Sequence, residues 1–174
     1  MGLQADIVAR ARSVRLAIFD VDGVLTDGTV WIGPRGEVFK PFNILDGHGV
    51  KMLQAAGVDT AILSGRDSEA VLRRADELSI RHVVQGASDK LAAFEELLAE
   101  AGCGAEACAF VGDDLPDLPV LRRCGFAVAV ANAVDEVKAA CHYVTTASGG
   151  RGAVREFCDL VLRAQGQLGA ARAV

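Results

Sequence analysis

Carboxylates follow an apolar stretch near the start of this 174-residue chain. Asp20 and Asp22 come directly after the apolar run at residues 16–19, and Gly23 follows them. A strand that only packs in a core has no use for two carboxylates at its tip, because their charges repel each other. A divalent cation removes that repulsion. The spacing therefore predicts a cation site at this point.

Two further apolar runs end in residues of similar kinds. Ser64 and Gly65 follow the run at residues 58–63, and Asp113 and Asp114 follow the run at residues 107–111 after one glycine. In an open parallel sheet, functional residues gather at the carboxyl ends of the strands. We therefore expect these side chains to meet at one edge of a sheet.

The chemistry that such a set supports is phosphoryl transfer. Mg²⁺ takes oxygen ligands, which Asp20, Asp113 and one main-chain carbonyl would supply. One carboxylate can then attack phosphorus and form an aspartyl-phosphate. A second carboxyl two residues further on can protonate the leaving oxygen and later activate water. Ser64, the Gly65 amide and Lys90 are suited to stabilise the charge of the transition state.

Each residue also has a plainer interpretation. The Asp-X-Asp-Gly pattern occurs in calcium loops, but the longer Asp/Asn spacing that ends in Glu does not follow here. Ser64 and Gly65 are compatible with an ordinary strand-to-helix turn, and Lys90 with a solvated side chain. Asp114 is compatible with a simple helix N-cap. The order of these residues on one predicted sheet is what favours catalysis.

The elements that must position these residues alternate along the chain. The predicted strands are residues 16–19, 58–63, 82–84, 107–111, 126–130 and 142–145, and the predicted helices are residues 47–56, 68–78, 88–101, 115–123, 134–140 and 152–165. Near-continuous apolar strands separated by amphipathic helices indicate a parallel sheet covered on both faces. We therefore predict one doubly wound, Rossmann-like α/β domain over residues 1–174, a length that suits a single core.

The segment at residues 28–42, GTVWIGPRGEVFKPF, breaks this alternation. Two β-rich runs flank a Gly-Pro-Arg-Gly turn, which predicts an inserted hairpin. A two-stranded ribbon is marginal alone and exposes its edges. Trp31 and Phe39 therefore suggest that the hairpin packs on something, either another copy of the chain or its own domain.

Composition narrows the class of protein. With 51% hydrophobic and 24% charged residues, the chain is typical of a soluble folded domain. A net charge of −5 argues against nucleic-acid binding. The apolar runs are too short to predict a membrane span. The five scattered cysteines lack a CxxC pair, which favours reduced thiols in a cytoplasmic protein.

Four stretches in order resemble the motifs of the haloacid dehalogenase (HAD) superfamily of phosphatases: Asp20-Val21-Asp22-Gly23, Ser64-Gly65-Arg66, Lys90 and the GDDLPD run at residues 112–117. More narrowly, FDVDGVLTDG, FNILDGHG, SGRDSEAVLRRADEL, QGASDK, VGDDLPDLPVL and GGRGAVREFCDLVLRAQG resemble the branch that dephosphorylates 3-deoxy-D-manno-octulosonate 8-phosphate (KDO 8-phosphate) for lipopolysaccharide biosynthesis. This resemblance implies a Mg²⁺-dependent phosphomonoesterase without a separate cap domain.

The resemblance also implies a role for each matching residue. Asp20 would be the nucleophile and a metal ligand, and Asp22 the general acid/base whose main-chain oxygen also binds the metal. Asp113 would be the remaining metal carboxylate, with Asp114 and Asp117 supporting it. Ser64, Gly65 and Lys90 would grip the phosphate. The residues implied to contact substrate are Asp22, Asn43, Ile44, Leu45, Asp46, Gly47, Lys51, Arg66, Arg74, Lys90 and Arg151.

Two positions depart from the pattern of that branch. Leu45 stands where a basic residue is often found, and Lys51 where arginine is frequent. A lysine is a point charge and does not hold a carboxylate bidentately as arginine does. A phosphatase for a related sugar-acid phosphate, such as a nonulosonate 9-phosphate, is therefore an alternative. A catalytically inactive HAD-like interaction module is another, although its site would not need the complete motif set.

Members of this branch are homotetramers in which the hairpins assemble together. The resemblance implies that the C-terminal tail, residues 149–174, reaches a neighbouring subunit and places Arg151 near the substrate there. We expect deletion from Gly149 onward to depress catalysis more than stability, because this stretch is rich in glycine and carries arginine.

Overall fold

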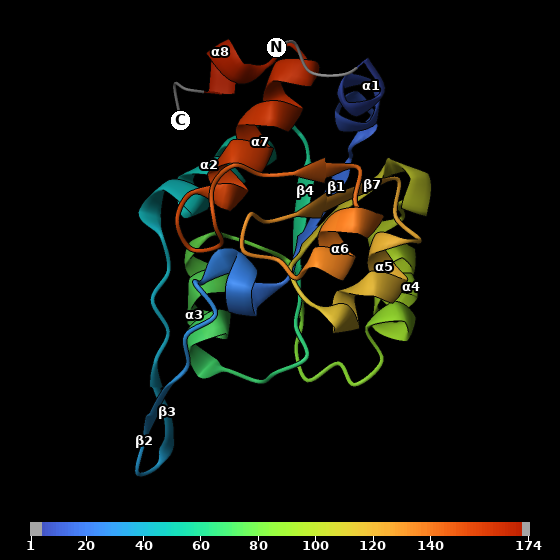
Figure 1. Ribbon diagram of the computed structural model, residues 1–174. Helices are drawn as coiled ribbons and strands as arrows, with labels where there is room; N and C mark the ends of the chain where they lie inside the picture. Colours follow the sequence, from blue (N-terminus) through green and yellow to red (C-terminus); the bar gives the residue numbers. More distant parts are fainter. Residues whose placement is uncertain (1–4, 172–174) are drawn as a thin grey trace.

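The computed structural model describes residues 5–171 and contains a six-stranded parallel sheet (Figure 1). The strands are β1 Leu16–Phe19, β4 Asp59–Leu63, β5 His82–Val84, β6 Cys108–Gly112, β7 Phe126–Ala129 and β8 Tyr143–Val144, in the order β5-β4-β1-β6-β7-β8. β1 lies in the interior of the sheet, where Leu16 is in register with Asp59 of β4 and Cys108 of β6. The predicted doubly wound α/β fold is confirmed.

Helices cover both faces of the sheet (Figure 1). The helices are α1 Ala5–Ser13, α2 Ile44–Ala55, α3 Glu69–Glu77, α4 Lys90–Ala101, α5 Leu118–Leu121, α6 Asp135–Ala140, α7 Ala153–Ala164 and α8 Leu168–Ala171. α2 packs on α7, which also contacts α1, and α4 packs on α5 on the other face. The chain moves outward from β1 through α2 and α3, then returns across the sheet through α4. This path places the two groups of helices on opposite faces.

The core is continuous through both faces because the interior strands are apolar along their whole length. All four residues of β1 are buried. Phe19 at the end of β1 meets Phe157 of α7 edge to face, with ring centroids 5.8 Å apart. β1 is therefore held between two layers, and the residue after Phe19 enters the site at a fixed place.

Helix α7 belongs to this core. Its buried residues are Ala153, Val154, Phe157, Cys158, Leu160, Val161 and Leu162. The structure argues against the expectation that deletion from Gly149 onward would depress catalysis more than stability, because the deletion would remove these side chains from the core. The ends of the predicted ranges, residues 1–4 and 172–174, lie outside the described residues.

Several element boundaries differ from the sequence prediction for local reasons. α2 begins at Ile44 rather than residue 47, because the Asn43 side chain caps it by accepting a hydrogen bond from Leu45 N at 2.8 Å. The helix predicted for residues 115–123 is a 3-10 turn, Leu115–Asp117, followed by the short α5. Pro116 and Pro119 lack an N–H, so each lies in a first turn rather than in a helix interior. α1 was not predicted as an element.

Within residues 28–42 the chain forms the antiparallel strands β2 Trp31–Gly33 and β3 Gly36–Phe39. This hairpin projects away from the sheet (Figure 1). The Trp31 and Phe39 rings stack at 5.1 Å and are 49% and 52% exposed. Ile32 and Val38 beside them are also exposed. The apolar face of the hairpin is therefore uncovered within a single chain.

Among the helices of residues 5–171, none combines the length and the apolar composition that crossing a bilayer requires.

Candidate active site

The carboxyl ends of β1, β4 and β6 meet at one edge of the sheet and deliver Asp20, Ser64 and Asp113 to the same place. They line a cavity of about 190 Å³, whose wall consists of Asp20, Asp22, Ser64, Gly65, Arg66, Lys90, Asp113, Asp114, Pro116 and Asp117. The structure thus brings together all of the residues predicted for catalysis, metal binding and phosphate binding.

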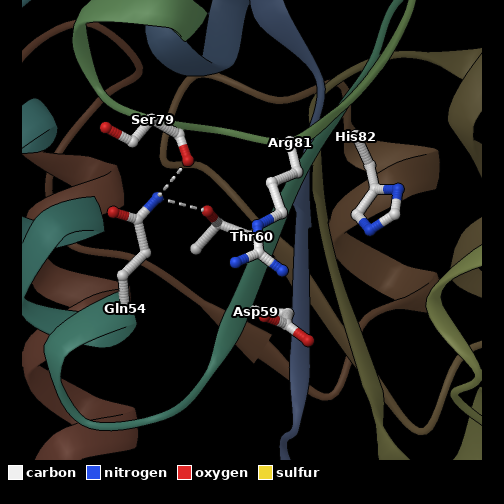
Figure 2. Close-up of a pocket in the computed structure, with 6 residues that line it drawn as sticks. All are labelled: Gln54, Asp59, Thr60, Ser79, Arg81 and His82. Carbon is white, nitrogen blue, oxygen red and sulfur yellow. Dashed lines mark hydrogen bonds between the residues drawn. The ribbon is translucent and has the colours of Figure 1, made fainter.

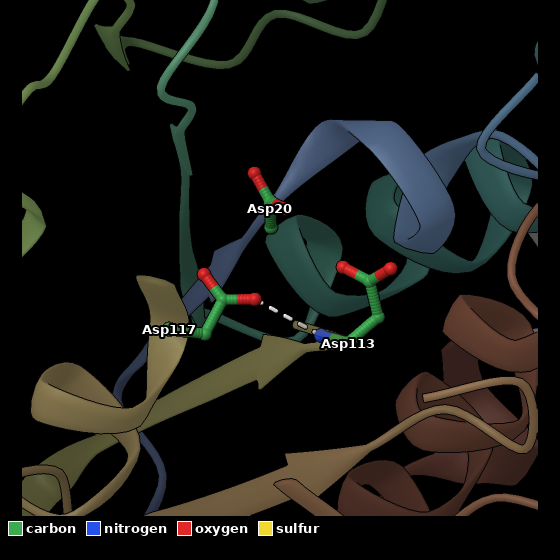
Figure 3. A group of neighbouring side chains, drawn as sticks. All are labelled: Asp20, Asp113 and Asp117. Carbon is green, nitrogen blue, oxygen red and sulfur yellow. Dashed lines mark hydrogen bonds between the residues drawn. The ribbon is translucent and has the colours of Figure 1, made fainter. Parts of the chain in front are cut away.

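Three of the carboxylates that line this cavity lie close to one another (Figure 3). Asp20, Asp113 and Asp117 each place one carboxylate oxygen within 4.8 Å of the others. They come from the end of β1, the end of β6 and the 3-10 turn after β6. Carboxylates held this close are stable as anions only when positive charge compensates them.

The charge on this cluster is not fully compensated by the protein. Burial raises the pKa of Asp20 to about 7, and the negative charge of Asp117 adds to this effect while Lys90 opposes it. Burial also raises the pKa of Asp113 to about 7, with further increases from Asp20 and Asp117. Both groups would ionise more readily if a cation were bound between them.

One oxygen of the cluster has no partner within residues 5–171. Asp113 Oδ1 is buried and receives no hydrogen bond. Buried polar atoms are normally paired, so this oxygen is available to a ligand. A hard divalent cation accepts oxygen ligands of this kind and neutralises neighbouring carboxylates. The residues present therefore fit Mg²⁺.

Lys90 is the cation that the protein itself supplies. Its Nζ lies 3.0 Å from Asp20 Oδ1 and 2.7 Å from Asp117 Oδ1, and its side chain is only 8% exposed. Burial alone would lower the pKa of Lys90, but the two carboxylates outweigh burial and raise it. The interpretation of Lys90 as a solvated side chain is therefore wrong. Asp89 fixes its position by capping α4 through Leu91 N and Ala92 N.

Asp117 and Asp114 hold the loop after β6. Asp117 Oδ2 accepts hydrogen bonds from Asp113 N at 3.0 Å and Asp114 N at 3.3 Å. Asp114 accepts one from Leu115 N at 2.8 Å and caps the turn that follows. Asp117 thus contacts both Lys90 and the backbone of Asp113, and the loop keeps the Asp113 carboxylate beside Asp20.

The loop after β1 turns sharply over Val21–Leu25. Gly23 has φ +92°, a conformation that favours glycine, and a Cβ there would overlap the Asp113 carboxylate. The buried Thr26 closes the turn, since its hydroxyl donates to Val21 O at 3.3 Å and accepts from Gly23 N at 3.4 Å. The glycine of the first motif is therefore needed for both backbone shape and close approach.

The Asp22 side chain lines the cavity and also contacts Lys40 at the end of the hairpin. Its Oδ1 contacts Lys40 Nζ, and its Oδ2 lies 3.7 Å from Arg66 Nε. Glu37 of β3 binds the same two cations, at 3.2 Å from Lys40 and 3.3 Å from Arg66. Ser68 Oγ also donates to Glu37 at 2.6 Å. Burial alone would raise the pKa of Glu37, but the hydrogen bonds from Ser68 and Lys40 hold it below its usual value.

Sequence reasoning missed Glu37, Lys40 and Ser68. Glu37 and Lys40 lie in a hairpin whose visible signal was its aromatic residues. The only sequence signal for them was that Glu37 and Lys40 are oppositely charged and three residues apart at the end of a predicted strand. Such pairs are usually solvated, so this signal does not indicate a functional site.

The implied substrate contacts at the start of α2 do not line the carboxylate cavity. Ile44 and Leu45 are 81% and 59% exposed on the surface. Asn43 caps α2 and donates from Nδ2 to Gly150 O at 3.2 Å. Gly47 and Lys51 lie further along α2. Within one chain these positions therefore lie outside the wall of the carboxylate cavity.

The Asp46 side chain joins two helices instead of lining the cavity. It is buried, and its carboxylate accepts hydrogen bonds from Arg155 N at 2.8 Å and Gly152 N at 3.3 Å. Burial raises its pKa, although these hydrogen bonds oppose the increase. The side chain therefore caps α7 from α2 and has no free oxygen turned toward the cavity.

Arg74 and Arg151 are likewise occupied within the chain. Arg74 pairs with Glu77 at 2.7 Å and donates to Asn43 O at 3.4 Å. Arg151 lies 3.2 Å from Asp27 at the surface. Arg151 and Asn43 line a separate cavity of about 380 Å³ together with Asp27, Trp31, Phe39, Pro41, Phe42 and Gly150.

The turn at residues 149–152 packs directly on the loop that carries Asp22. Gly150 N donates to Val24 O at 2.9 Å, and a Cβ at Gly149 would overlap Gly23 O. Asn132 joins the two segments, since it donates to Gly23 O at 3.2 Å and accepts from Gly149 N at 2.7 Å. Sequence reasoning missed Asn132, which carries no motif signal.

A second polar cavity, of about 280 Å³, lies at the opposite end of the strands (Figure 2). Its lining residues are Gln54, Asp59, Thr60, Ser79, Arg81 and His82. Gln54 Nε2 is already bonded there to Thr60 Oγ1 at 2.8 Å and Ser79 O at 3.5 Å. The cavity holds one carboxylate, Asp59, so it lacks the paired acids that phosphoryl transfer needs. The candidate active site is therefore the cavity lined by Asp20.

The fold and the site together indicate the class of protein, a hydrolase built on a doubly wound sheet with acids at the ends of β1 and β6. Residues 79–157 match the family model described as haloacid dehalogenase-like hydrolase. The 3-deoxy-D-manno-octulosonate 8-phosphate phosphatase of Yersinia pestis is 48% identical over 163 residues, covering 94% of this chain and 87% of that protein. The enzyme of the same name from Escherichia coli (strain K12) is 46% identical and covers 98% of this chain and 90% of its own length.

Solved structures agree with the sequence matches. The 3-deoxy-D-manno-octulosonate 8-phosphate phosphatase of Moraxella catarrhalis, in complex with a magnesium ion, a phosphate ion and a KDO molecule, superposes with a TM-score of 0.94. It is 42% identical, and the match covers 98% of each chain. This chain therefore belongs to the 3-deoxy-D-manno-octulosonate 8-phosphate phosphatase family of the haloacid dehalogenase-like hydrolases.

Proposed function

We propose that this chain is a Mg²⁺-dependent phosphomonoesterase that hydrolyses KDO 8-phosphate to KDO and phosphate, as a step of lipopolysaccharide biosynthesis. The observation that carries the proposal is the cluster of Asp20, Asp113 and Asp117, which lines one cavity together with Lys90. Lys90 contacts the buried carboxylates of Asp20 and Asp117. The choice of KDO 8-phosphate as the substrate rests on the family to which the chain belongs.

Asp20 acts as the nucleophile and Asp22 as the general acid and base. Asp20 attacks phosphorus, so that a bond from its carboxylate oxygen to phosphorus forms as the bond to the sugar oxygen breaks. Asp22 donates its proton to that leaving oxygen. Asp22 then accepts a proton from the water that attacks the aspartyl-phosphate, which releases phosphate and restores the Asp20 carboxylate.

The remaining residues of the cavity hold the phosphoryl group and the charge. Asp20, Asp113 and the main-chain oxygen of Asp22 would bind Mg²⁺, which supplies positive charge for the carboxylates and for the developing transition state. Lys90 adds a fixed cation beside the Asp20 oxygen. Ser64 and the Gly65 amide bind the phosphoryl oxygens from the end of β4.

A kinetic panel tests this function. We expect hydrolysis of KDO 8-phosphate to require Mg²⁺ and to exceed that of other phosphorylated sugar acids. Asp20→Asn should abolish turnover while circular dichroism stays unchanged. Full activity of that variant would contradict the nucleophile assignment, and absence of turnover by the wild-type protein would indicate the inactive interaction module instead.

A second candidate substrate is favoured by two positions of α2. Leu45 is an exposed apolar residue and Lys51 a single point charge, so the carboxylate end of the sugar has fewer guanidinium partners than the branch usually offers. A nonulosonate 9-phosphate would present a different sugar to the same phosphoryl site. Equal kcat/KM on the two substrates would contradict a narrow preference for KDO 8-phosphate.

We also propose that the chain works as a homotetramer in the cytoplasm. The exposed faces of Trp31, Phe39, Ile44 and Leu45 support self-association, since apolar patches of this kind mark interfaces. Asn43, Ile44, Leu45 and Arg151 lie outside their own carboxylate cavity and would meet the substrate of a neighbouring copy. The five free cysteines suit a reducing compartment.

Sedimentation velocity tests the assembly. Trp31→Ser with Phe39→Ser should yield a monomer that keeps the fold and loses most activity on KDO 8-phosphate. A wild-type chain that sediments as a monomer at micromolar concentration would contradict the tetramer.

A further inference from the structure

The acid/base candidate Asp22 belongs to a closed ring of four charged side chains. Lys40 and Arg66 each contact both Asp22 and Glu37, so two cations alternate with two carboxylates. Lys40 comes directly after β3, whereas Arg66 follows β4. The ring therefore joins the inserted hairpin to the catalytic edge of the sheet.

Lys40 is the buried member of this ring. Its side chain is 2% exposed, whereas that of Arg66 is 48% exposed. A lysine is rarely buried so deeply, because desolvating its ammonium is costly unless carboxylates surround it. Asp22 and Glu37 are the carboxylates that compensate this cost. Lys40 therefore has a fixed position, and the Asp22 oxygen in contact with it is fixed as well.

The position of Asp22 matters more than that of an ordinary surface acid. A general acid must lie within hydrogen-bond reach of the leaving oxygen. The Asp22 side chain is 21% exposed, so it is accessible from the cavity while Lys40 contacts it from the hairpin. Without Lys40, the carboxylate would be free to rotate or to turn toward other cations.

We propose that Lys40 is a positioning residue for Asp22, holding its carboxyl group in the orientation from which it donates a proton to the leaving oxygen, and that Glu37 keeps Lys40 in place. This inference rests on the proposed phosphatase function. The inserted hairpin would then have two roles: its apolar face would mediate self-association, and Lys40 at its end would position the acid/base residue.

A comparison of leaving groups distinguishes positioning from simple structural support. p-Nitrophenolate leaves without protonation, whereas the alkoxide of a sugar needs a proton from the general acid. kcat/KM reports the steps up to formation of the aspartyl-phosphate, which both substrates share. We expect Lys40→Met to lower kcat/KM by about 100-fold on KDO 8-phosphate and by less than about 5-fold on p-nitrophenyl phosphate.

Three variants complete the test. Lys40→Arg, which keeps the charge, should restore most of the lost activity. Lys138→Met is the matched control, because Lys138 lies on α6 and pairs with Asp135, and it should change neither rate. On an Asp22→Asn background, Lys40→Met should change kcat/KM by less than about twofold, because residues that act as a unit are not additive.

Equal losses on the two substrates, or a full additional loss on the Asp22→Asn background, would overturn the proposal. If Lys40→Met does not fold by circular dichroism, Glu37→Gln carries the same test and should show the same selectivity at a smaller magnitude. A wild-type chain active on p-nitrophenyl phosphate but not on KDO 8-phosphate would contradict only the proposed function. The ratio would then be measured on a primary alkyl phosphate that the chain accepts.

Discussion

The backbone N–H of Arg155 donates a hydrogen bond of 2.8 Å to Asp46 Oδ1, which joins the first turn of α7 to the first turn of α2. The two residues are 109 positions apart in the sequence. Because the first N–H groups of a helix have no partner within the helix, a buried carboxylate there accepts hydrogen bonds from donors that would otherwise be unpaired. This contact fixes residues 43–47 against the turn at residues 149–152.

Replacement of Asp46 tests whether its role is structural. We expect Asp46→Ala to lower the free energy of unfolding by about 1–2 kcal/mol, the usual cost of losing a helix cap. Urea denaturation measures this change. Asp46→Asn is the control, since its amide oxygen still accepts a hydrogen bond and a neutral group suits a site where burial raises the pKa of Asp46. Unchanged stability with a large rise in KM would indicate a substrate contact instead.

Replacement of Asp113 tests the metal site. The unpaired Oδ1 of Asp113 and its like-charged neighbours make the site unfavourable without a cation. We expect Mg²⁺ at about 100 times its Kd to stabilise the wild-type chain by about 2–3 kcal/mol. Asp113→Asn should be more stable than wild type in chelator and should gain little from Mg²⁺. Thermal unfolding with and without Mg²⁺ measures both effects, and an equal gain for the two proteins would contradict the assignment.

The stability of the chain in chelator should depend on pH. Folding raises the pKa values of Asp20 and Asp113 from 3.8 to about 7, so the folded state binds more protons than the unfolded state between these values. Stability should therefore fall as pH rises from about 4 to about 7. Urea midpoints across this range measure the slope. Excess Mg²⁺ or Asp20→Asn should reduce it, and a slope of opposite sign would show that these carboxylates stay ionised.

Removal of the C-terminal segment should unfold the protein. α7 buries seven residues, and Phe157 contacts both Phe19 and Phe126 in the core. We expect a chain that ends before Gly149 to lack cooperative unfolding in calorimetry. Phe157→Ala, a milder change, should cost about 3–5 kcal/mol. A truncated chain that melts cooperatively near the wild-type temperature would show that α7 is dispensable.

The sequence predicts the sheet, and the meeting of the candidate site residues at one of its edges, because both depend on short-range patterns. Strands buried on both faces read as unbroken apolar runs, and the residues after β1, β4 and β6 necessarily share one edge. The hydrogen bonds of Asp46 could not be predicted in this way, because its partners lie at the start of α7, 106 and 109 positions away, and no local sequence pattern indicates such contacts. Lys40 was missed for a related reason. Its burial depends on how the hairpin folds back at its base, while the hairpin's aromatic residues face outward.

The contacts made by Asn132 and the turn at residues 149–152 have a consequence for when activity can arise. The loop after β1 leaves the ribosome well before the groups that hold its backbone, since Asn132 follows Gly23 by 109 positions. A nascent chain therefore carries Asp20 long before the contacts that hold the loop around it exist, and activity should appear only after residues 149–152 have been made.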